Sequence, residues 1–329
     1  MSNENRGFTE KSHQNEENAR KAYSTAGIAC FATLAVGYVV KFVIKRLFPS
    51  LASYTWGTWF LSFAPLYLVG VPVTVLIFLR VPAHSGVDGK GGTASLELGQ
   101  IVRAAFIGIF LLRVGSVVGD RVTGVIQALI GISKESKLDT LLRSNDLLIV
   151  KILITAIAGP LIEELIYRKL LIDRIRCYGG KLAVVTSGLM FGLFHGNFSQ
   201  FFYAFAVGIL FAYIYLKTGK YRYSAALHIL INSIGVLEAT AFLSVSGLLT
   251  DIENASGGEL ALIFVWALVE VGAVIIGLVL FCRSWRKATY EPASMELPKG
   301  SKIRVAYLNV GMLVFVVFCA VLFVRSFLV

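Results

Sequence analysis

The chain has 329 residues, of which 56% are hydrophobic and 16% are charged, and its mean hydropathy is +0.73. Soluble domains are about 45–50% apolar and about 25% charged, so this composition excludes an ordinary soluble globular protein. The formal net charge is +11. Because the basic residues lie in short connections and form no Lys- or Arg-rich arm, we expect no nucleic acid partner.

The hydrophobic residues form blocks of about 20, the length that crosses a bilayer core of roughly 30 Å. They predict an all-α, polytopic transmembrane bundle of about eight to nine membrane helices. The apolar segments lie at 22–44, 57–79, 99–119, 146–167, 181–197, 200–216, 223–247, 259–282 and 304–327.

The domain organisation follows from these segments. Residues 1–21 are polar and mixed in charge, which predicts a disordered N-terminal tail. N-terminal transmembrane helices fill 22–140, a core that carries the candidate site fills 141–248, and C-terminal transmembrane helices fill 249–329.

The distribution of Lys and Arg between the connections predicts the orientation. If the N-terminus is cytoplasmic, most of these residues fall in cytoplasmic connections, as the positive-inside rule requires. An odd number of membrane helices then places the C-terminus outside. We therefore expect an integral, multi-pass protein in the plasma membrane of a bacterium.

The stretch AIAGPLIEELIYRKLL, residues 156–171, places two adjacent glutamates, Glu163 and Glu164, in an apolar segment. Ionisable groups inside a membrane span are rare and usually face the bundle interior. Arg168 follows Glu164 by four residues, so a helix places the two on one face as an ion pair. Glu163 points about 100° away and has no such partner. We take both glutamates as candidate catalytic residues and Arg168 as a supporting residue.

A histidine in the next segment is expected at the same height as Glu163. The connection RCYGGK predicts a turn at Gly179, between the segments 146–167 and 181–197. Glu163 precedes Gly179 by sixteen residues and His195 follows it by sixteen. In an antiparallel helical hairpin both therefore lie roughly 24 Å from the turn.

A second histidine, His228, lies in the stretch HILIN with Asn232 four residues later, so a helix places both on one face. A desolvated carboxylate can act as a general base near neutral pH. Glu163 with His195 can hold and deprotonate a water, while His228 and Asn232 can donate hydrogen bonds to a developing oxyanion. The simplest outcome is hydrolysis of an amide bond in a membrane-bound or membrane-associated peptide substrate.

Other polar groups in the apolar segments receive structural interpretations. Arg103, Arg113, Glu238 and Glu270 have no matching partners in the sequence and are expected to bond to neighbouring helices. The four cysteines form no C-x-x-C pair, so they predict neither a disulfide framework nor a thiolate metal site.

Three stretches, EELIYR, FGLFH and HILIN, resemble the motifs E-E-x-x-x-R, F-x-x-x-H and H-x-x-x-N of the CAAX prenyl endopeptidase and bacteriocin-processing (CPBP, or Abi) family of intramembrane glutamic proteases. The similarity covers about residues 145–245 and implies that 141–248 is the catalytic core. It also implies that Glu163 and His195 activate water and that His228 and Asn232 form the oxyanion site, without a cofactor. The implied substrates are C-a-a-X proteins or secreted-peptide precursors.

Two alternatives remain open from the residues alone. Glu163, His195 and His228 make a His₂Glu set, which suits catalytic zinc, although the H-E-x-x-H spacing is absent. The second alternative is a non-catalytic membrane scaffold or immunity protein. The sequence indicates neither the substrate nor the oligomeric state.

Overall fold

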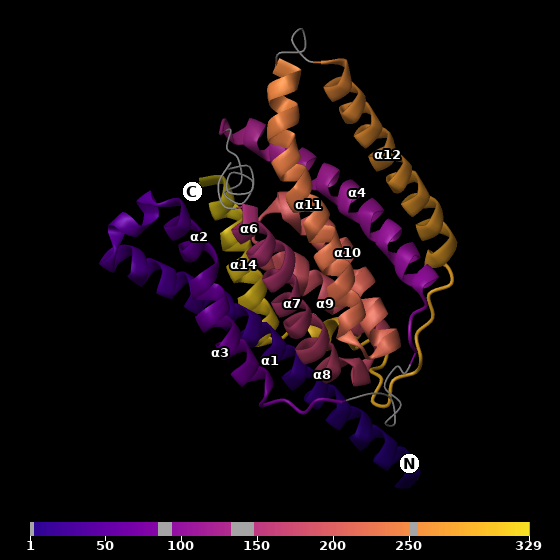
Figure 1. Ribbon diagram of the computed structural model, residues 1–329. Helices are drawn as coiled ribbons and strands as arrows, with labels where there is room; N and C mark the ends of the chain where they lie inside the picture. The colour runs from indigo at the N-terminus through magenta and orange to yellow at the C-terminus, as the bar shows by residue number, and fades with distance from the viewer. Residues whose placement is uncertain (1–2, 85–93, 133–147, 251–255, 329) are drawn as a thin grey trace.

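The computed structural model describes residues 3–84, 94–132, 148–250 and 256–328, and within these ranges the chain forms helices and no strands. The helices run in alternating directions through one bundle, with the N-terminus and the C-terminus at opposite ends (Figure 1). This confirms the prediction of an all-α, polytopic helical bundle.

The N-terminal part consists of three long helical stretches and a short 3-10 turn. Its elements are α1 (Asn3–Leu47), η1 (Pro49–Ser53), α2 (Thr55–Ala64), η2 (Pro65–Gly70), α3 (Val71–Phe78) and α4 (Leu98–Ile130). The stretch from α2 through α3 is continuous, and η2 is a π-helical turn in its middle that begins at a proline.

The middle of the chain contains the predicted core. Its elements are α6 (Leu148–Lys151), η3 (Ile152–Ala158), α7 (Gly159–Glu164), η4 (Leu165–Ile172), α8 (Asp173–Ile175), η5 (Arg176–Tyr178), α9 (Gly180–Phe194), α10 (Phe198–Thr218) and α11 (Tyr221–Thr250). The C-terminal part adds α12 (Gly257–Trp285), α13 (Lys302–Tyr307) and α14 (Val310–Leu328).

Six helical stretches in the described residues are long and apolar enough to cross a membrane. They are Ser12–Leu47, Thr55–Phe78, Leu98–Ile130, Phe198–Thr218, Gly257–Trp285 and Val310–Leu328. The other three predicted segments are helical too: 181–197 corresponds to α9, which has only 15 residues, 146–167 to a stretch divided by π-helical turns, and 223–247 to α11. Only 6% of the apolar window of α12 is buried, which fits a lipid-facing helix.

The prediction of a disordered tail at 1–21 was wrong, because α1 begins at Asn3. The N-terminal end of this helix packs on the C-terminal part: Ala19 and Tyr23 are fully buried, and Glu16 pairs with Arg304 at 2.9 Å. These long-range contacts stabilise a segment whose composition alone does not predict order. The predicted boundary at residues 140 and 141 lies outside the described residues.

One charged cluster ties the peripheral helices together. Arg113 of α4 donates from its Nη2 to Glu238 of α11 and from its Nε to Glu270 of α12. Each of these charges is partly buried in an apolar helix, where an unpaired charge is strongly unfavourable. The structural role expected for these residues agrees with this arrangement.

Candidate active site

The helix that carries the two glutamates is irregular. The π-helical elements η3 and η4 flank the short helix α7, which begins at Gly159-Pro160. The Gly159 N–H bonds to the carbonyl oxygen of Ile154, five residues earlier, and proline has no N–H to continue the regular pattern. Such π-helical turns are frequent at functional sites because they rotate the following residues relative to the helix before them.

Glu164 and Arg168 form the predicted ion pair, and both side chains are fully buried. Arg168 Nε lies 3.1 Å from Glu164 Oε2, and its Nη1 donates to Ser187 Oγ on α9 at 2.6 Å. The Ser187 hydroxyl in turn donates to the Tyr167 carbonyl at 2.9 Å. Arg168 therefore neutralises Glu164 and joins the two helices of the hairpin.

His228 of α11 lies between the two glutamates. Its Nδ1 is 3.2 Å from Glu164 Oε1, and its Nε2 is 3.6 Å from Glu163 Oε2. Because Glu164 is paired with Arg168, it accepts a hydrogen bond from Nδ1–H and fixes the ring orientation. The gap to Glu163 exceeds a hydrogen-bond length, so Nε2 remains available to a bound group.

His195 follows the end of α9. The predicted turn is present: Gly179 has φ 142°, a conformation that favours glycine, and α9 begins at Gly180. His195 Nδ1 lies 2.8 Å from the Phe191 carbonyl, which can only accept, so Nδ1 carries the proton and Nε2 is an acceptor in the neutral ring. No hydrogen bond or ion pair joins His195 to Glu163 within the described ranges.

Asn232 lies one turn after His228 on α11, as the spacing predicts. Its Nδ2 donates to the Thr155 carbonyl of η3 at 2.8 Å. This bond pairs a carbonyl of the π-helical turn with the neighbouring helix. The second Nδ2 hydrogen is not needed for this contact and can serve a bound group.

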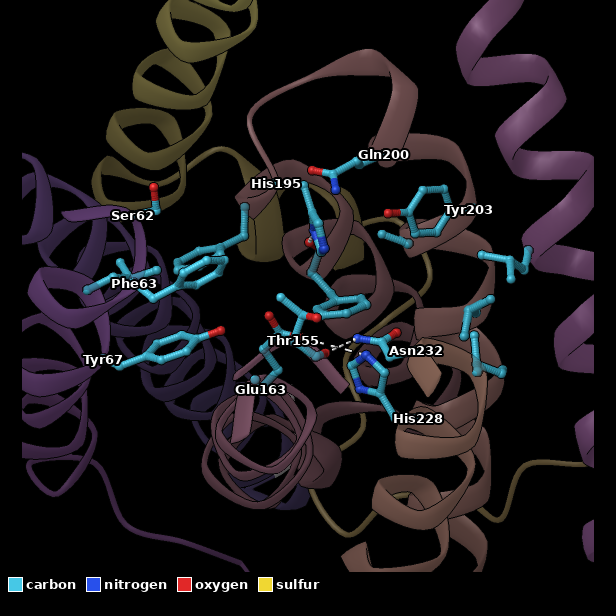
Figure 2. Close-up of a pocket in the computed structure, with 18 residues that line it drawn as sticks. Ser62, Phe63, Tyr67, Thr155, Glu163, His195, Gln200, Tyr203, His228 and Asn232 are labelled. Carbon is cyan, nitrogen blue, oxygen red and sulfur yellow. Dashed lines mark hydrogen bonds and ion pairs between the residues drawn. The ribbon is translucent and has the colours of Figure 1, made fainter. Parts of the chain in front are cut away.

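The side chains of Glu163, His195, His228 and Asn232 line one cavity of about 250 Å³ (Figure 2). Glu163 is 20% exposed at the side chain and His228 is 5% exposed, whereas Glu164 and Arg168 have no exposed surface. Glu163, His195, His228 and Asn232 therefore contact the cavity. The Glu164–Arg168 pair lies behind them and does not reach the cavity. The rest of the wall is mainly apolar and aromatic.

The cavity wall includes polar residues that sequence reasoning missed. They are Ser62, Tyr67, Gln200 and Tyr203. Ser62 and Tyr67 come from α2 and η2, far from the three motifs in the sequence, and no local pattern marks them. Their position depends on how the segment 55–78 packs on α7, which the sequence does not indicate.

The zinc alternative requires Glu163, His195 and His228 to converge on one ion. Among the described residues, no three His, Cys, Asp or Glu side chains converge closely enough to hold a metal ion. The Phe191 ring contacts both imidazoles edge-on, with ring centroids 4.9 Å from His195 and 5.6 Å from His228. Zinc ligands lie about 2.0–2.2 Å from the ion, and the described side chains as they stand do not form such a set.

Comparisons with known proteins agree with the motifs. Residues 145–234 match the sequence model of a family described as "Type II CAAX prenyl endopeptidase Rce1-like". A Bacillus subtilis (strain 168) protein named "Putative membrane peptidase YdiL" is 25% identical over 169 residues. That alignment covers 50% of this chain and 66% of the relative, just under two thirds of its length. No solved structure matches significantly.

The matched segment runs from just before α6 into α11 and includes all three motifs. The motif resemblance is thereby confirmed: residues 145–234 are similar to the Rce1-like, type II CAAX prenyl endopeptidase family.

Proposed function

We propose that this chain is an intramembrane endopeptidase that hydrolyses a peptide bond with a water activated by Glu163. One observation supports this most directly: four polar side chains from three separate helices line a single small cavity within an apolar bundle. A buried ionic cluster seldom stabilises a fold more than apolar packing would. Catalysis is therefore the better reason for the cluster.

The first step needs a water between Glu163 and His195. These side chains line the same cavity without touching, so a water can bridge the carboxylate and the free Nε2 of His195. Glu163 accepts a proton from the water as its oxygen bonds to the peptide carbonyl carbon. The carbon–oxygen π bond opens, and the carbonyl oxygen becomes an oxyanion.

The oxyanion requires hydrogen-bond donors that are already in place. We assign this role to His228 Nε2, as the donor of a protonated ring, and to the second Nδ2 hydrogen of Asn232. When the tetrahedral intermediate collapses, the carbon–nitrogen bond breaks. The departing amine takes the proton from Glu163, which restores the carboxylate. Glu164 and Arg168 act by positioning His228.

The proposed substrate is a membrane-associated peptide, either a C-a-a-X-type protein or a secreted-peptide precursor. The apolar and aromatic cavity wall suits an extended peptide with apolar side chains entering from the bilayer. We propose that no metal takes part, because no three His, Cys, Asp or Glu side chains in the described part of the chain are grouped as metal ligands. Zinc dependence predicts that a chelator abolishes cleavage and that added zinc restores it.

The test compares N- and C-terminal peptide profiles of cells that carry the intact protein or Glu163→Gln. Peptide termini that appear only with the intact protein identify the substrate and support the proposal. Glu291→Gln is the matched control, because Glu291 is 78% exposed in a connection away from the cavity. Identical profiles for the intact protein and Glu163→Gln, with a full cellular phenotype, would favour the scaffold or immunity role instead.

A further inference from the structure

Tyr67 lies outside the matched segment, yet its hydroxyl reaches the cavity. It is on η2, 96 residues before Glu163 of the first motif, and its half-buried side chain forms part of the cavity wall. Figure 2 shows its hydroxyl directed toward Glu163, with His228 on the other side of the carboxylate in this view. The N-terminal helices thus supply a polar group to a site built by the core.

Gly159 leaves room for the hydroxyl. A Cβ atom at this glycine would lie 2.8 Å from Tyr67 Oη, so a larger residue would require the phenol to shift from this position. Gly159 is one helical turn before Glu163, which places the two on the same face of α7. The phenol therefore lies along the face of α7 that presents the candidate base.

Aromatic packing holds the ring in this orientation. Trp59, Phe63 and Tyr67 follow one another at intervals of four residues, with ring centroids 5.4 Å and 5.9 Å apart. Trp59 is 1% exposed and anchors this row in the bundle. A ring packed in this way loses little further freedom when its hydroxyl binds a group in the cavity.

The Tyr67 hydroxyl is available as a hydrogen-bond donor. Across the described part of the chain, no hydrogen bond joins Tyr67 Oη to another protein group. Buried tyrosine hydroxyls usually have a hydrogen-bond partner, so one without a protein partner that faces a cavity is available to a water or a substrate group there. The other donors near Glu163 already use one hydrogen each in bonds to the protein: His228 bonds to Glu164, and Asn232 bonds to Thr155.

We infer that Tyr67 is a further catalytic residue, which donates a hydrogen bond from its phenol to the carbonyl oxygen of the substrate as that oxygen becomes negative. The inference rests on the proposed function. Tyr67 keeps its proton throughout, while the water proton passes to Glu163 and then to the departing amine. Its contribution is therefore greater in the transition state than in substrate binding.

The test uses Tyr67→Phe in the full chain, with the peptide that the Glu163 comparison identifies. Removal of one such donor lowers kcat by on the order of 100-fold. We expect that loss with little change in KM and with an unchanged thermal midpoint, because the ring and its packing remain. Tyr38→Phe is the matched control: Tyr38 lies on α1 against Phe318, outside the cavity.

A second variant tests the geometry. Gly159→Ala places a methyl group against Tyr67 Oη, so it should lower kcat in the presence of Tyr67 and have a smaller effect in the Tyr67→Phe background. If Glu163→Gln abolishes cleavage and Tyr67→Phe cleaves at the normal rate, the role of Tyr67 is wrong and the proposed function stands. If cleavage does not depend on Glu163, both are wrong.

Discussion

His228 Nδ1 and Glu164 Oε1 lie 3.2 Å apart, although 64 residues separate them in the sequence. Glu164 is fully buried and also pairs with Arg168, so one carboxylate fixes both the charge balance and the orientation of the imidazole. The other imidazole nitrogen then faces Glu163 and the cavity. This arrangement gives the two glutamates different roles: Glu164 is a supporting residue and Glu163 is the candidate base.

Replacement of Glu164 should affect both stability and activity. Glu164→Gln leaves Arg168 buried without its counter-charge, and breaking a buried ion pair from one side destabilises by about 3–5 kcal/mol. The double variant Glu164→Gln/Arg168→Met should recover much of the stability but not the cleavage, because His228 lacks its anchor. Thermal unfolding and peptide cleavage, measured on the same preparations, separate the two effects. Full activity in the double variant would contradict the positioning role.

Replacement of Glu163 should remove activity without a large loss of stability. Its side chain is partly exposed to the cavity and has no direct hydrogen bond among the residues described. Glu163→Gln should therefore abolish cleavage and change the thermal midpoint by only a few degrees at most, because glutamine keeps the shape of the side chain and no hydrogen bond to the described part of the protein is lost. A large loss of stability would indicate a structural carboxylate instead.

The cluster of Arg113, Glu238 and Glu270 should be structural. Arg113→Leu leaves two partly buried carboxylates close together without a cation, which we expect to destabilise by about 3–5 kcal/mol. The triple variant with Glu238→Gln and Glu270→Gln removes the unpaired charges and should recover most of that loss. Thermal unfolding in detergent measures this, with cleavage by the triple variant expected to remain near normal. Loss of cleavage without loss of stability would instead assign the cluster a role in catalysis.

The connection between α12 and α13 packs on the hairpin turn, and its stability should fall in acid. The hydrogen bond from Lys302 holds the pKa of Glu296 below its ordinary value of 4.5. A lowered pKa means that the pair stabilises the folded state above that ordinary value and loses this contribution as the pH falls through the lowered pKa. The same connection bonds to the turn, from the Leu297 N–H to the Tyr178 carbonyl at 3.2 Å.

Hydrogen exchange at Leu297 measures this effect. Protection should fall as the medium is acidified past the lowered pKa of Glu296, after correction for the intrinsic exchange rate. Glu296→Gln should show weaker protection at neutral pH and no such step. Because the pair is partly exposed to solvent, the change should be under about 1 kcal/mol. Equal protection in both proteins at every pH would show that the pair does not hold the connection.

Much of the site could be predicted because helical spacing constrains it directly. The Glu164–Arg168 pair and the shared face of His228 and Asn232 depend only on intervals of four residues. The hairpin at Gly179 followed from two adjacent glycines. The direct approach of His228 to both glutamates was not predicted, because a spacing within one helix does not indicate how a third helix rotates against it.

Other features depend on tertiary packing alone. Tyr67 carries no motif, and its place in the cavity follows from the π-helical turn at Pro65 and from the space left by Gly159. Order in the N-terminal part of α1 depends on contacts such as that between Glu16 and Arg304, which are 288 residues apart. Composition describes only the local preference of such a segment, and long-range contacts override it.

Cleavage by the purified protein in lipid vesicles tests the central claim most directly. The intact chain, Glu163→Gln and Glu291→Gln are each treated with a chelator and given the peptide that the cell comparison identifies. The account predicts that the intact chain and Glu291→Gln cleave at equal rates with chelator present and that Glu163→Gln does not cleave. Cleavage by Glu163→Gln at the rate of the intact chain would contradict it, and so would complete loss of cleavage on chelation with recovery on added zinc.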